Sequence, residues 1–461
     1  MPDWTPDLTR SDKPRYLAIA DLIAEDLRSG QLSIGDRLPP QRQLAARLGV
    51  DFTTVARGYV EAQKRGLVES RVGRGTFVCA PPRQAPPPPR PARSDFVDLS
   101  MNLPPEPDDP ALIARMQEGV AEVSRDLVSL LRYQAFGGSP ADKDAASAWL
   151  GRRSLVPSQD RLFVTPGAHP ALLGIFSILA APGEVVLCEA LTYPGMRAIA
   201  AQLRLKLVGL PMDADGVDPD AFKSACETLK PKAIYLNPTL HNPTTLTVPA
   251  TRRVAIAAVA RRYNVPIVED DAYGFIPAQG QPPFAAIAPD LTWHVAGLAK
   301  CIGAGLRAAY VVAPDARSGW PFAAAMRAAN VMASPLTTAI ATRWIEDGSA
   351  DTILRFIRTE TAARQELAAD ILPKGSFRAD RLSFNLWMEL PKPWTRSAFI
   401  GHMGSARIGV VASDAFTVGG DPIEAIRICI GGPTGREEIR SALEYIAHAL
   451  TQSPAHALQF L

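Results

Sequence analysis

The chain has 461 residues, 47% of them apolar and 21% charged, with a formal net charge of +2. This composition excludes a globally disordered protein, and at about 150 residues per domain the length favours two or three domains. The five cysteines form no C-x-x-C pair, which argues against a disulfide framework or a zinc site. With no signal-peptide pattern and no apolar run of ~18 residues, we expect a cytoplasmic protein and no membrane partner.

Basic charge is concentrated at the start of the chain. Residues 1–95 contain 15 Lys and Arg against 11 Asp and Glu, whereas residues 96–461 contain 34 against 36. A basic module on a near-neutral body is typical of a protein that binds a polyanion through one domain. A solvated surface with a chance excess of charge is the alternative that charge alone leaves open.

The first predicted elements are three short helices. Apolar residues recur at helical spacing in residues 13–29 and 41–48, and a glycine follows each segment. Asp51 can cap a third helix whose inward face consists of Val55, Tyr59 and Ala62. Residues 67–78 then read as two strands joined around Gly73-Arg74-Gly75. A helix-turn-helix followed by such a wing is a DNA-binding architecture, with a protein-contact role as the alternative.

Residues 13–79 resemble the winged helix-turn-helix of the GntR-type regulators, in the patterns LPPQRQLAARLGV and TTVARGYVEAQKRGLVESRVGRGTFV. The resemblance implies that operator DNA is contacted by Arg42, Thr53, Thr54, Arg57 and, at the wing tip, Arg74. Thr53 and Arg57 are four residues apart and therefore share a helix face. Two positions depart from the pattern. Phe52 stands where arginine is frequent, and Gly58 costs the helix up to ~1 kcal/mol.

A proline-rich segment separates this module from the rest of the chain. Residues 80–93 contain seven prolines and three arginines, which favours an extended, semi-rigid spacer over an SH3-type ligand. We therefore divide the chain into a DNA-binding domain (1–79), a linker (80–95) and a second domain (96–461).

In the second domain, short apolar runs such as LFVT, VVLCE, AIYL and PIVED alternate with longer helical segments. This alternation predicts an α/β fold with a mostly parallel sheet. No strand is followed by G-x-G-x-x-G, and the G-x-x-x-x-G-K-[ST] pattern is missing. Residues 137–141 lack the last glycine of G-x-S-x-G. Nicotinamide, nucleoside triphosphate and serine-hydrolase chemistry are therefore poorly supported.

Residues 96–452 resemble the fold-type I aminotransferases, and the whole chain resembles the MocR-type subgroup of GntR regulators. The motifs occur in the family's order: RYQAFGG, TPGAHPALL, LTYPG, LHNPTT, VEDDAYGF, HVAGLAKCIGAGLR and AIRICIGGP. The resemblance implies a pyridoxal phosphate cofactor and a transferase fold with a small C-terminal α/β subdomain.

The resemblance also assigns roles around the cofactor ring. Lys300 is the catalytic lysine that forms the aldimine, and Asp270 bonds to the pyridine nitrogen, with Asp271 as the competing choice. The groups assigned to the 3-hydroxyl oxygen and to the ring face are Tyr273, Asn242 and Tyr193.

For the phosphate, the resemblance implies the amides around Ala168 and His169, the side chain of Arg307, and Tyr133 from the neighbouring subunit of a homodimer. Arg427 corresponds to the arginine that grips a substrate α-carboxylate. Two positions depart from the family. Gly297 replaces a serine that serves the phosphate, and Thr245 replaces a glycine in NPTG.

The resulting hypothesis is a pyridoxal-phosphate-dependent transcription regulator. It binds operator DNA through the winged helix and senses a small amine or amino acid, or the cofactor itself, at Lys300. The rival is a catalytically active aminotransferase with an accessory DNA-binding head. An intact basic reading head has no role in catalysis, which favours regulation.

Overall fold

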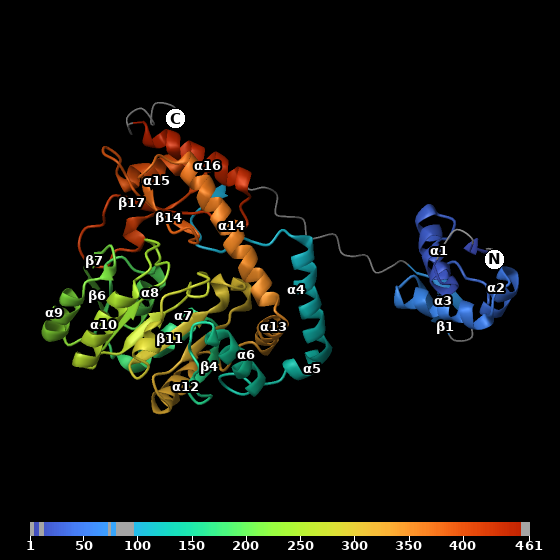
Figure 1. The fold of residues 1–461 in the computed structure, drawn as a ribbon, viewed down its shortest axis with the longest axis horizontal. Helices are drawn as coiled ribbons and strands as arrows, with labels where there is room; N and C mark the ends of the chain where they lie inside the picture. The colour runs from blue at the N-terminus through green and yellow to red at the C-terminus, as the bar shows by residue number, and fades with distance from the viewer. Residues whose placement is uncertain (1–3, 9–12, 72–74, 80–95, 453–461) are drawn as a thin grey trace. The chain divides into compact units, whose positions relative to one another are not determined.

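The computed structural model describes residues 4–8, 13–71, 75–79 and 96–452. It separates into two compact units, Met1–Ser94 and Asp95–Leu461 (Figure 1). The predicted linker and wing-tip Arg74 lie outside the described residues. No helix in the described part of the chain is long and apolar enough to cross a membrane.

The N-terminal unit has the three helices and the hairpin that the sequence predicts. They are α1 (Arg15–Ser29), α2 (Gln41–Leu48), α3 (Phe52–Lys64), β1 (Val68–Arg71) and β2 (Gly75–Val78). Left-handed glycines end the first two helices, Gly30 at φ 81° and Gly49 at φ 62°. The Asp51 carboxylate caps α3 by accepting the amide of Thr53 at 2.8 Å.

Helices α1 and α3 pack very closely, and Gly58 allows the approach. A Cβ at this position would lie 2.9 Å from Ile19 Cγ2 and 3.1 Å from the carbonyl oxygen of Tyr16. The inward positions predicted for α3, Val55, Tyr59 and Ala62, are all buried. The glycine that weakens α3 in isolation is therefore needed for its packing against α1.

The second unit is built on a seven-stranded sheet. In spatial order its strands are β4 (Leu162–Thr165), β12 (Ala309–Val312), β11 (Thr292–Gly297), β10 (Ile267–Asp270), β9 (Ala233–Leu236), β5 (Val185–Glu189) and β6 (Lys206–Leu210). Only β12 runs antiparallel to its neighbours, so the predicted mostly parallel sheet is confirmed. The other six strands end at one edge of the sheet.

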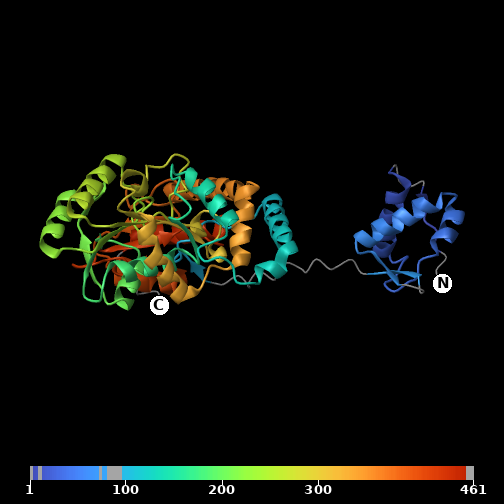
Figure 2. The same cartoon turned by 90° about the horizontal axis from the view of Figure 1, so that it is seen from below.

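Helices cover both faces of this sheet (Figures 1 and 2). One face packs against α7 (Ala168–Leu179), α8 (Pro194–Gln202) and α12 (Ala316–Asn330). The other packs against α6 (Pro140–Gly151), α9 (Pro219–Leu229), α10 (Ala250–Tyr263), α11 (Phe284–Ile287) and α13 (Pro335–Glu346). Because both faces are buried, the strands read in the sequence as continuous apolar runs.

A smaller subdomain follows the long helix α14 (Ser349–Ile371). Its antiparallel sheet has the order β13 (Phe377–Arg378), β14 (Asn385–Glu389), β17 (Ala425–Cys429) and β16 (Val411–Ala412). Helices α15 (Arg396–Ser405) and α16 (Arg436–Leu450) pack on it. Beside it, β15 (Ile408–Gly409) pairs in parallel with β3 (Val97–Asp98), which brings the start of the second unit to its C-terminal subdomain. The two-stranded β7 (Met212–Asp213) and β8 (Gly216–Val217) complete the strands of the described chain, and α4 (Pro110–Val123) and α5 (Leu127–Leu130) precede α6.

Candidate functional site

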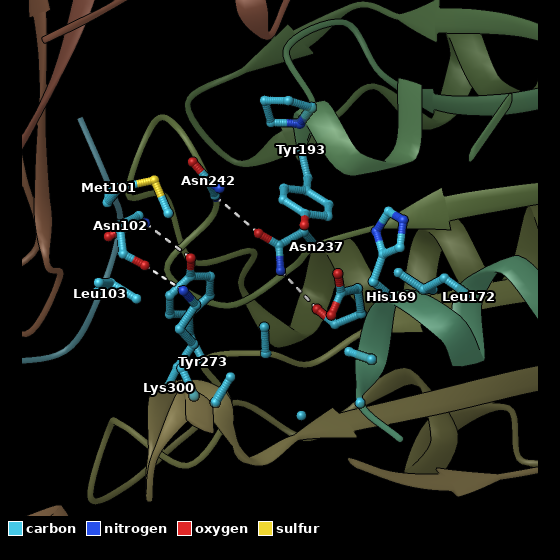
Figure 3. A pocket seen from close by; sticks show the side chains of 18 of the residues that line it. Met101, Asn102, Leu103, His169, Leu172, Tyr193, Asn237, Asn242, Tyr273 and Lys300 are labelled. Carbon is cyan, nitrogen blue, oxygen red and sulfur yellow. Dashed lines mark hydrogen bonds between the residues drawn. The ribbon is translucent and has the colours of Figure 1, made fainter. Parts of the chain in front are cut away.

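A cavity of about 420 Å³ lies at the edge of the large sheet where the parallel strands end. Its walls come from the turns after β4, β9, β10 and β11, from Arg427 on β17 and from residues 101–103 (Figure 3). Ligands of open α/β sheets bind at such an edge, because loops from several strands converge there. Of the residues predicted to bind cofactor or substrate, all but Tyr133 line this one cavity.

Lys300 projects into the cavity from the turn after β11. Its amine donates a hydrogen bond to the carbonyl oxygen of Asn102. Burial lowers the pKa of Lys300 to about 8, so more of this side chain is the neutral, nucleophilic amine near neutral pH than in an exposed lysine.

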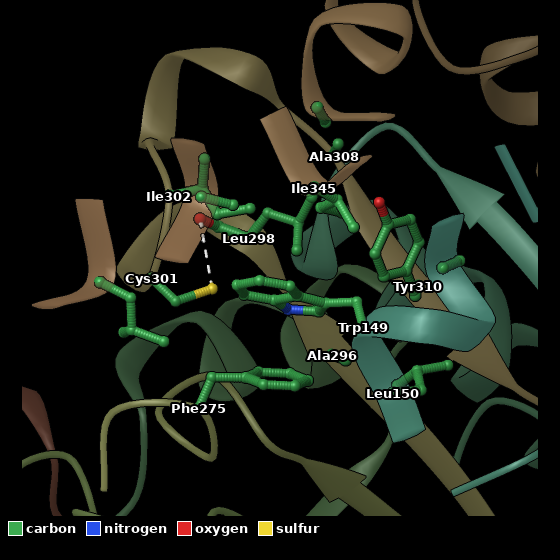
Figure 4. Close-up of a cluster of buried hydrophobic side chains, with 14 of the residues drawn as sticks. Trp149, Leu150, Phe275, Ala296, Leu298, Cys301, Ile302, Ala308, Tyr310 and Ile345 are labelled. Carbon is green, nitrogen blue, oxygen red and sulfur yellow. Dashed lines mark hydrogen bonds between the residues drawn. The ribbon is translucent and has the colours of Figure 1, made fainter. Parts of the chain in front are cut away.

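The turn that carries Lys300 is anchored in a cluster of buried hydrophobic residues. Leu298, Cys301 and Ile302 pack into the cluster that holds Trp149 and Phe275 (Figure 4). The ring centroids of Trp149 and Phe275 lie 5.1 Å apart. Because the flanking residues are buried, the lysine has a fixed origin at the cavity wall.

Asp270 is the carboxylate that faces the cavity. Its Oδ2 accepts a hydrogen bond from the Tyr235 hydroxyl at 2.8 Å, whereas Oδ1 is buried and has no partner in the part of the chain that the structure describes. Burial raises the pKa of Asp270 to about 6. A buried carboxylate oxygen without a partner is costly unless a ligand donates to it, and a protonated pyridine nitrogen is such a donor.

Asp271, the competing choice, points elsewhere. It is fully buried and accepts the Arg153 guanidinium, with 3.0 Å between Oδ2 and Nε. The positive charge of Arg153 holds the pKa of Asp271 below its usual value. This carboxylate belongs to the protein interior and not to the cavity.

A chain of hydrogen bonds links the ring region to Arg427. The Asn237 amide donates to the backbone oxygen of Asp270 at 2.7 Å, and Asn237 Oδ1 accepts the backbone N–H of Asn242 at 2.9 Å. Asn242 Oδ1 in turn accepts Arg427 Nη1 at 2.7 Å. Among the described residues, the buried Arg427 Nε has no hydrogen-bond partner, and Arg427 itself lines the cavity.

The N-terminal turn of α7 and Arg307 form a cradle for an anion. Gly167, at φ 108°, precedes α7, and a Cβ there would lie 3.3 Å from Arg307 Nη2. Free N–H groups of a helix start and a guanidinium together suit a phosphate. Ala168 and His169 are the first residues of α7, and burial, with a smaller effect of Arg307, lowers the pKa of His169.

Two aromatic residues of the prediction lie in different environments. Tyr193 lines the cavity (Figure 3). Tyr133 lies outside the cavity and is 85% exposed. Its predicted contact with the phosphate of a neighbouring subunit requires a second chain.

Three polar residues of this site were missed by sequence reasoning: Asn102, Tyr235 and Asn237. Asn102 Nδ2 donates to the Tyr273 hydroxyl at 2.9 Å, across 171 positions of sequence. Tyr235 reads as an ordinary strand aromatic. Asn237 comes directly after a strand and before a proline, and this position at a strand end was the one sign in the sequence that it belongs to the site.

The predicted DNA-contacting residues lie on the first unit. Arg42, Thr53 and Arg57 are exposed, and Thr54 is half-buried. The Arg42 Cζ lies 5.8 Å from the centroid of the Phe52 ring, and the Arg57 Cζ lies 4.2 Å from that of Tyr16. Aromatic faces thus orient both guanidinium groups.

Two protein-family models match the chain, one in each of its two units. The family model for aminotransferase class I and II matches residues 94–446. The chain belongs to that family. The model for bacterial regulatory proteins of the gntR family matches residues 15–78, so the chain is a GntR regulator with an aminotransferase domain, the MocR type.

Two curated relatives match more than four fifths of this chain. The chain is 27% identical to the uncharacterized HTH-type transcriptional regulator YdeF of Bacillus subtilis, over 97% of this chain and 96% of that protein. It is 25% identical to the vitamin B6 salvage pathway transcriptional repressor PtsJ of Salmonella typhimurium, over 83% and 86%. The crystal structure of LysN, an α-aminoadipate aminotransferase of Thermus thermophilus, superposes with a TM-score of 0.70 at 21% identity, over 80% of this chain and 94% of that chain.

Pyridoxal phosphate is the cofactor of this domain, and the residues present fit it. The partnerless Asp270 oxygen matches a ring nitrogen that carries a proton. The neutral form of Lys300 matches an aldehyde, and the Gly167–Arg307 cradle matches a phosphate.

Proposed function

We propose that this protein is a transcription regulator whose DNA affinity depends on what its aminotransferase-like pocket holds. The effector is a small amine or amino acid, or pyridoxal phosphate itself. The observation that carries the proposal is the convergence of Lys300, Asp270 and Arg427 in one cavity of a chain that begins with a GntR winged helix.

Lys300, Asp270 and Tyr193 have separate tasks in this function. When bound, the cofactor supplies an aldehyde that joins reversibly to amines and a ring that withdraws electrons. Lys300 supplies the neutral amine that holds the aldehyde, and Asp270 holds a proton at the ring nitrogen. Tyr193 covers the ring and keeps water away from it.

Arg427 favours an effector that carries a carboxylate. It is 7% exposed and lines the cavity, and two of its five N–H groups donate to neutral oxygens. A carboxylate is a stronger acceptor than these amide and carbonyl oxygens and accepts two N–H groups at once. The amine of an amino acid would thus compete with Lys300 for the aldehyde, while its carboxylate binds Arg427.

DNA binding is proposed for the exposed side chains of α2 and α3. Phe52 cannot supply the charge of the arginine that is frequent at this position. Its ring instead supports the guanidinium of Arg42, so a basic side chain is still presented beside it. Arg57 and Thr53 share the exposed face of α3, where arginine reads guanine or binds phosphate. Operator binding places the protein in the cytoplasm with the chromosome.

We further propose a homodimer in which each pocket is completed by its neighbour. Exposed apolar side chains line the segment from α4 to Tyr133: Ile113, Val120, Leu127, Val128 and Leu131. An apolar strip of this length on a folded chain marks an interaction surface. Its continuity with Tyr133, the residue proposed to reach a neighbouring phosphate, favours a second copy as its partner.

The name of PtsJ connects that relative with vitamin B6 salvage, which supports pyridoxal phosphate as one candidate signal for this protein. In that case, binding of the cofactor to the pocket is the event that changes the affinity for DNA. If an amino acid is the signal, the cofactor is resident and the amino acid competes with Lys300 for it.

The proposal is tested by two variants of the full chain. Lys300→Ala should abolish the absorbance of covalently held pyridoxal phosphate and leave the intrinsic DNA contacts in place. Arg57→Ala should weaken binding to the DNA upstream of the protein's own gene by about 1–3 kcal/mol, with cofactor absorbance unchanged. Rapid conversion of the cofactor to pyridoxamine phosphate by an amino acid, followed by turnover with a keto acid and no footprint on that DNA, would favour the aminotransferase instead.

A further inference from the structure

The side of α3 that faces away from α1 carries a row of apolar side chains. Phe52, Ala56 and Val60 are spaced four residues apart and therefore share one face of the helix. Phe52 is 43% exposed, Val60 is 51% exposed, and Ala56 is half-buried. We call these three residues the outward row. Apolar side chains that are contiguous on a surface, unlike scattered ones, indicate a binding partner.

The charge around the outward row is mainly positive. Residues 41–64 contain four Arg and Lys residues against two acidic residues. Both acidic side chains are engaged within the protein, because Asp51 caps α3 and Glu61 Oε1 accepts Arg65 Nε at 2.8 Å. A surface that is both basic and apolar complements DNA, whose phosphates are negative and whose major groove exposes methyl groups.

Hydrogen-bond donors are scarce at the start of α3. The Thr53 hydroxyl donates to Asp51 Oδ1 at 2.5 Å, so its hydrogen is not offered to a base. The Phe52 ring has no donor or acceptor on its side chain. The guanidinium of Arg42, 5.8 Å from the centroid of that ring, is the nearby group that donates. A base that meets Phe52 is therefore recognised by apolar contact.

Phe52 is also the residue of the outward row that is best placed to reach a base. It is the first residue of α3, the second helix of the helix-turn-helix in the part of the chain that matches the gntR family. Such a helix enters the major groove with its N-terminal residues on the base edges. Val60 comes eight residues later, about 12 Å further along the helix. Thymine is the base that presents a methyl group in this groove, and phenylalanine is among the side chains that contact it.

We propose that Phe52 is a specificity-determining residue whose ring contacts the 5-methyl group of a thymine, so that the protein prefers an A·T pair at one position of its site. This assignment rests on the proposed DNA-binding function and adds the base that the residue recognises. The same ring holds Arg42 beside the contact.

The first experiment needs no variant. The full chain selects duplexes from a random pool, with and without pyridoxal phosphate, and the more tightly bound sequence is kept. Each thymine of this site is then replaced in turn by deoxyuridine, which pairs identically and lacks only the methyl group. At one position the replacement should weaken binding by about threefold to tenfold, because one methyl group leaves an apolar contact.

The second experiment assigns that methyl group to Phe52. Phe52→Ala should weaken binding to the thymine duplex and bind the thymine and deoxyuridine duplexes equally. Val60→Ala is the matched control, since it also shortens an exposed apolar side chain of the outward row. It should keep the difference between the two duplexes. Arg42→Ala should weaken binding to both duplexes by the same factor, because its guanidinium does not contact the methyl group.

Phe52→Arg changes the preference instead of removing it. Arginine pairs with guanine through two hydrogen bonds in the major groove. In a new selection from the random pool, this variant should therefore prefer guanine where the wild type prefers thymine. Selection of thymine at that position by both proteins would contradict the assignment.

Equal affinity of the wild type for the thymine and deoxyuridine duplexes at every position overturns the assignment and leaves the proposed function intact. A difference that persists in Phe52→Ala, or that disappears equally in Val60→Ala, overturns it as well. A wild-type chain that selects no sequence at all counts against the proposed regulator, and the assignment is then lost with it.

Discussion

At the scale of single residues, Lys300 is set apart from surface lysines by its burial. A pKa of about 8 in place of 10.5 leaves on the order of 200 times more neutral amine at pH 7.5. Only the neutral amine attacks an aldehyde. Burial of this side chain therefore speeds its reaction with an aldehyde, and it also lowers the stability of the folded protein.

This shift predicts the pH dependence of cofactor uptake. Below pH 8 each unit of pH should lower the rate of covalent uptake of pyridoxal phosphate by about tenfold, because the amine is protonated. Above pH 8 the rate should level off. Stopped-flow absorbance of the cofactor-free protein measures it, with Lys300→Ala as the blank. A rate that rises steadily to pH 10 would mean that the lysine has its ordinary pKa.

Gly297 offers a second residue-scale prediction. Within 4 Å, a Cβ at this position would meet only Ala168 Cβ, at 3.4 Å, so a serine side chain has room there. Gly297→Ser should tighten pyridoxal phosphate binding by about 1 kcal/mol, roughly fivefold, through a hydroxyl near the phosphate. Gly297→Ala adds the same Cβ without the hydroxyl and should leave the dissociation constant, measured by absorbance titration, unchanged. Equal gains in both variants would assign the effect to the backbone.

At the scale of elements, the junction of α1 and α3 decides the geometry of the DNA-reading helix. Gly58→Ala should raise the helix propensity of α3 and yet destabilise the unit by about 1–3 kcal/mol, because the new methyl group collides with Ile19 and the Tyr16 carbonyl. Native-state hydrogen exchange of α1 and α3 in the full chain measures this. Gly401→Ala in α15, where a Cβ meets nothing within 4 Å, should instead stabilise its own helix. A stabilised α3 would contradict the close packing.

The elements were largely predictable from the sequence, whereas the connections between them were not. Strand β10 is marked in the sequence by the apolar pair Ile267 and Val268, and Asp270 at its end was assigned by motif. The sequence carries no sign of the Tyr235 hydroxyl that orients this carboxylate, or of Asn102, whose partner lies 171 residues away. Gly58 was read as a defect, since helix propensity is local and the approach of α1 is tertiary.

At the scale of the whole molecule, the proposed homodimer gives a test of its own. The apolar strip from α4 to Tyr133 predicts the effect of charge on assembly. Val128→Glu with Leu131→Glu, at positions 72% and 73% exposed, should weaken the dimer by about 100-fold or more by burying charge at its interface. Cofactor affinity should fall as the dimer weakens, because each pocket then loses the Tyr133 of its neighbour.

Analytical ultracentrifugation and absorbance titration measure these two effects. Val156→Glu is the control, since this residue is 87% exposed on the loop between α6 and β4 and lies outside the strip. It should leave both the dimer and the cofactor affinity intact. A monomer with full cofactor affinity in the double variant would exclude a shared pocket.

The most direct test of the regulator is chemical. The full chain is incubated with pyridoxal phosphate, reduced with borohydride and mapped by mass spectrometry. We expect one phosphopyridoxyl group per chain, on Lys300, with loss of the absorbance change and of any effector-dependent DNA response in Lys300→Ala. A colourless protein, or label scattered over exposed lysines with Lys300 unmodified, would contradict ligand sensing through this pocket.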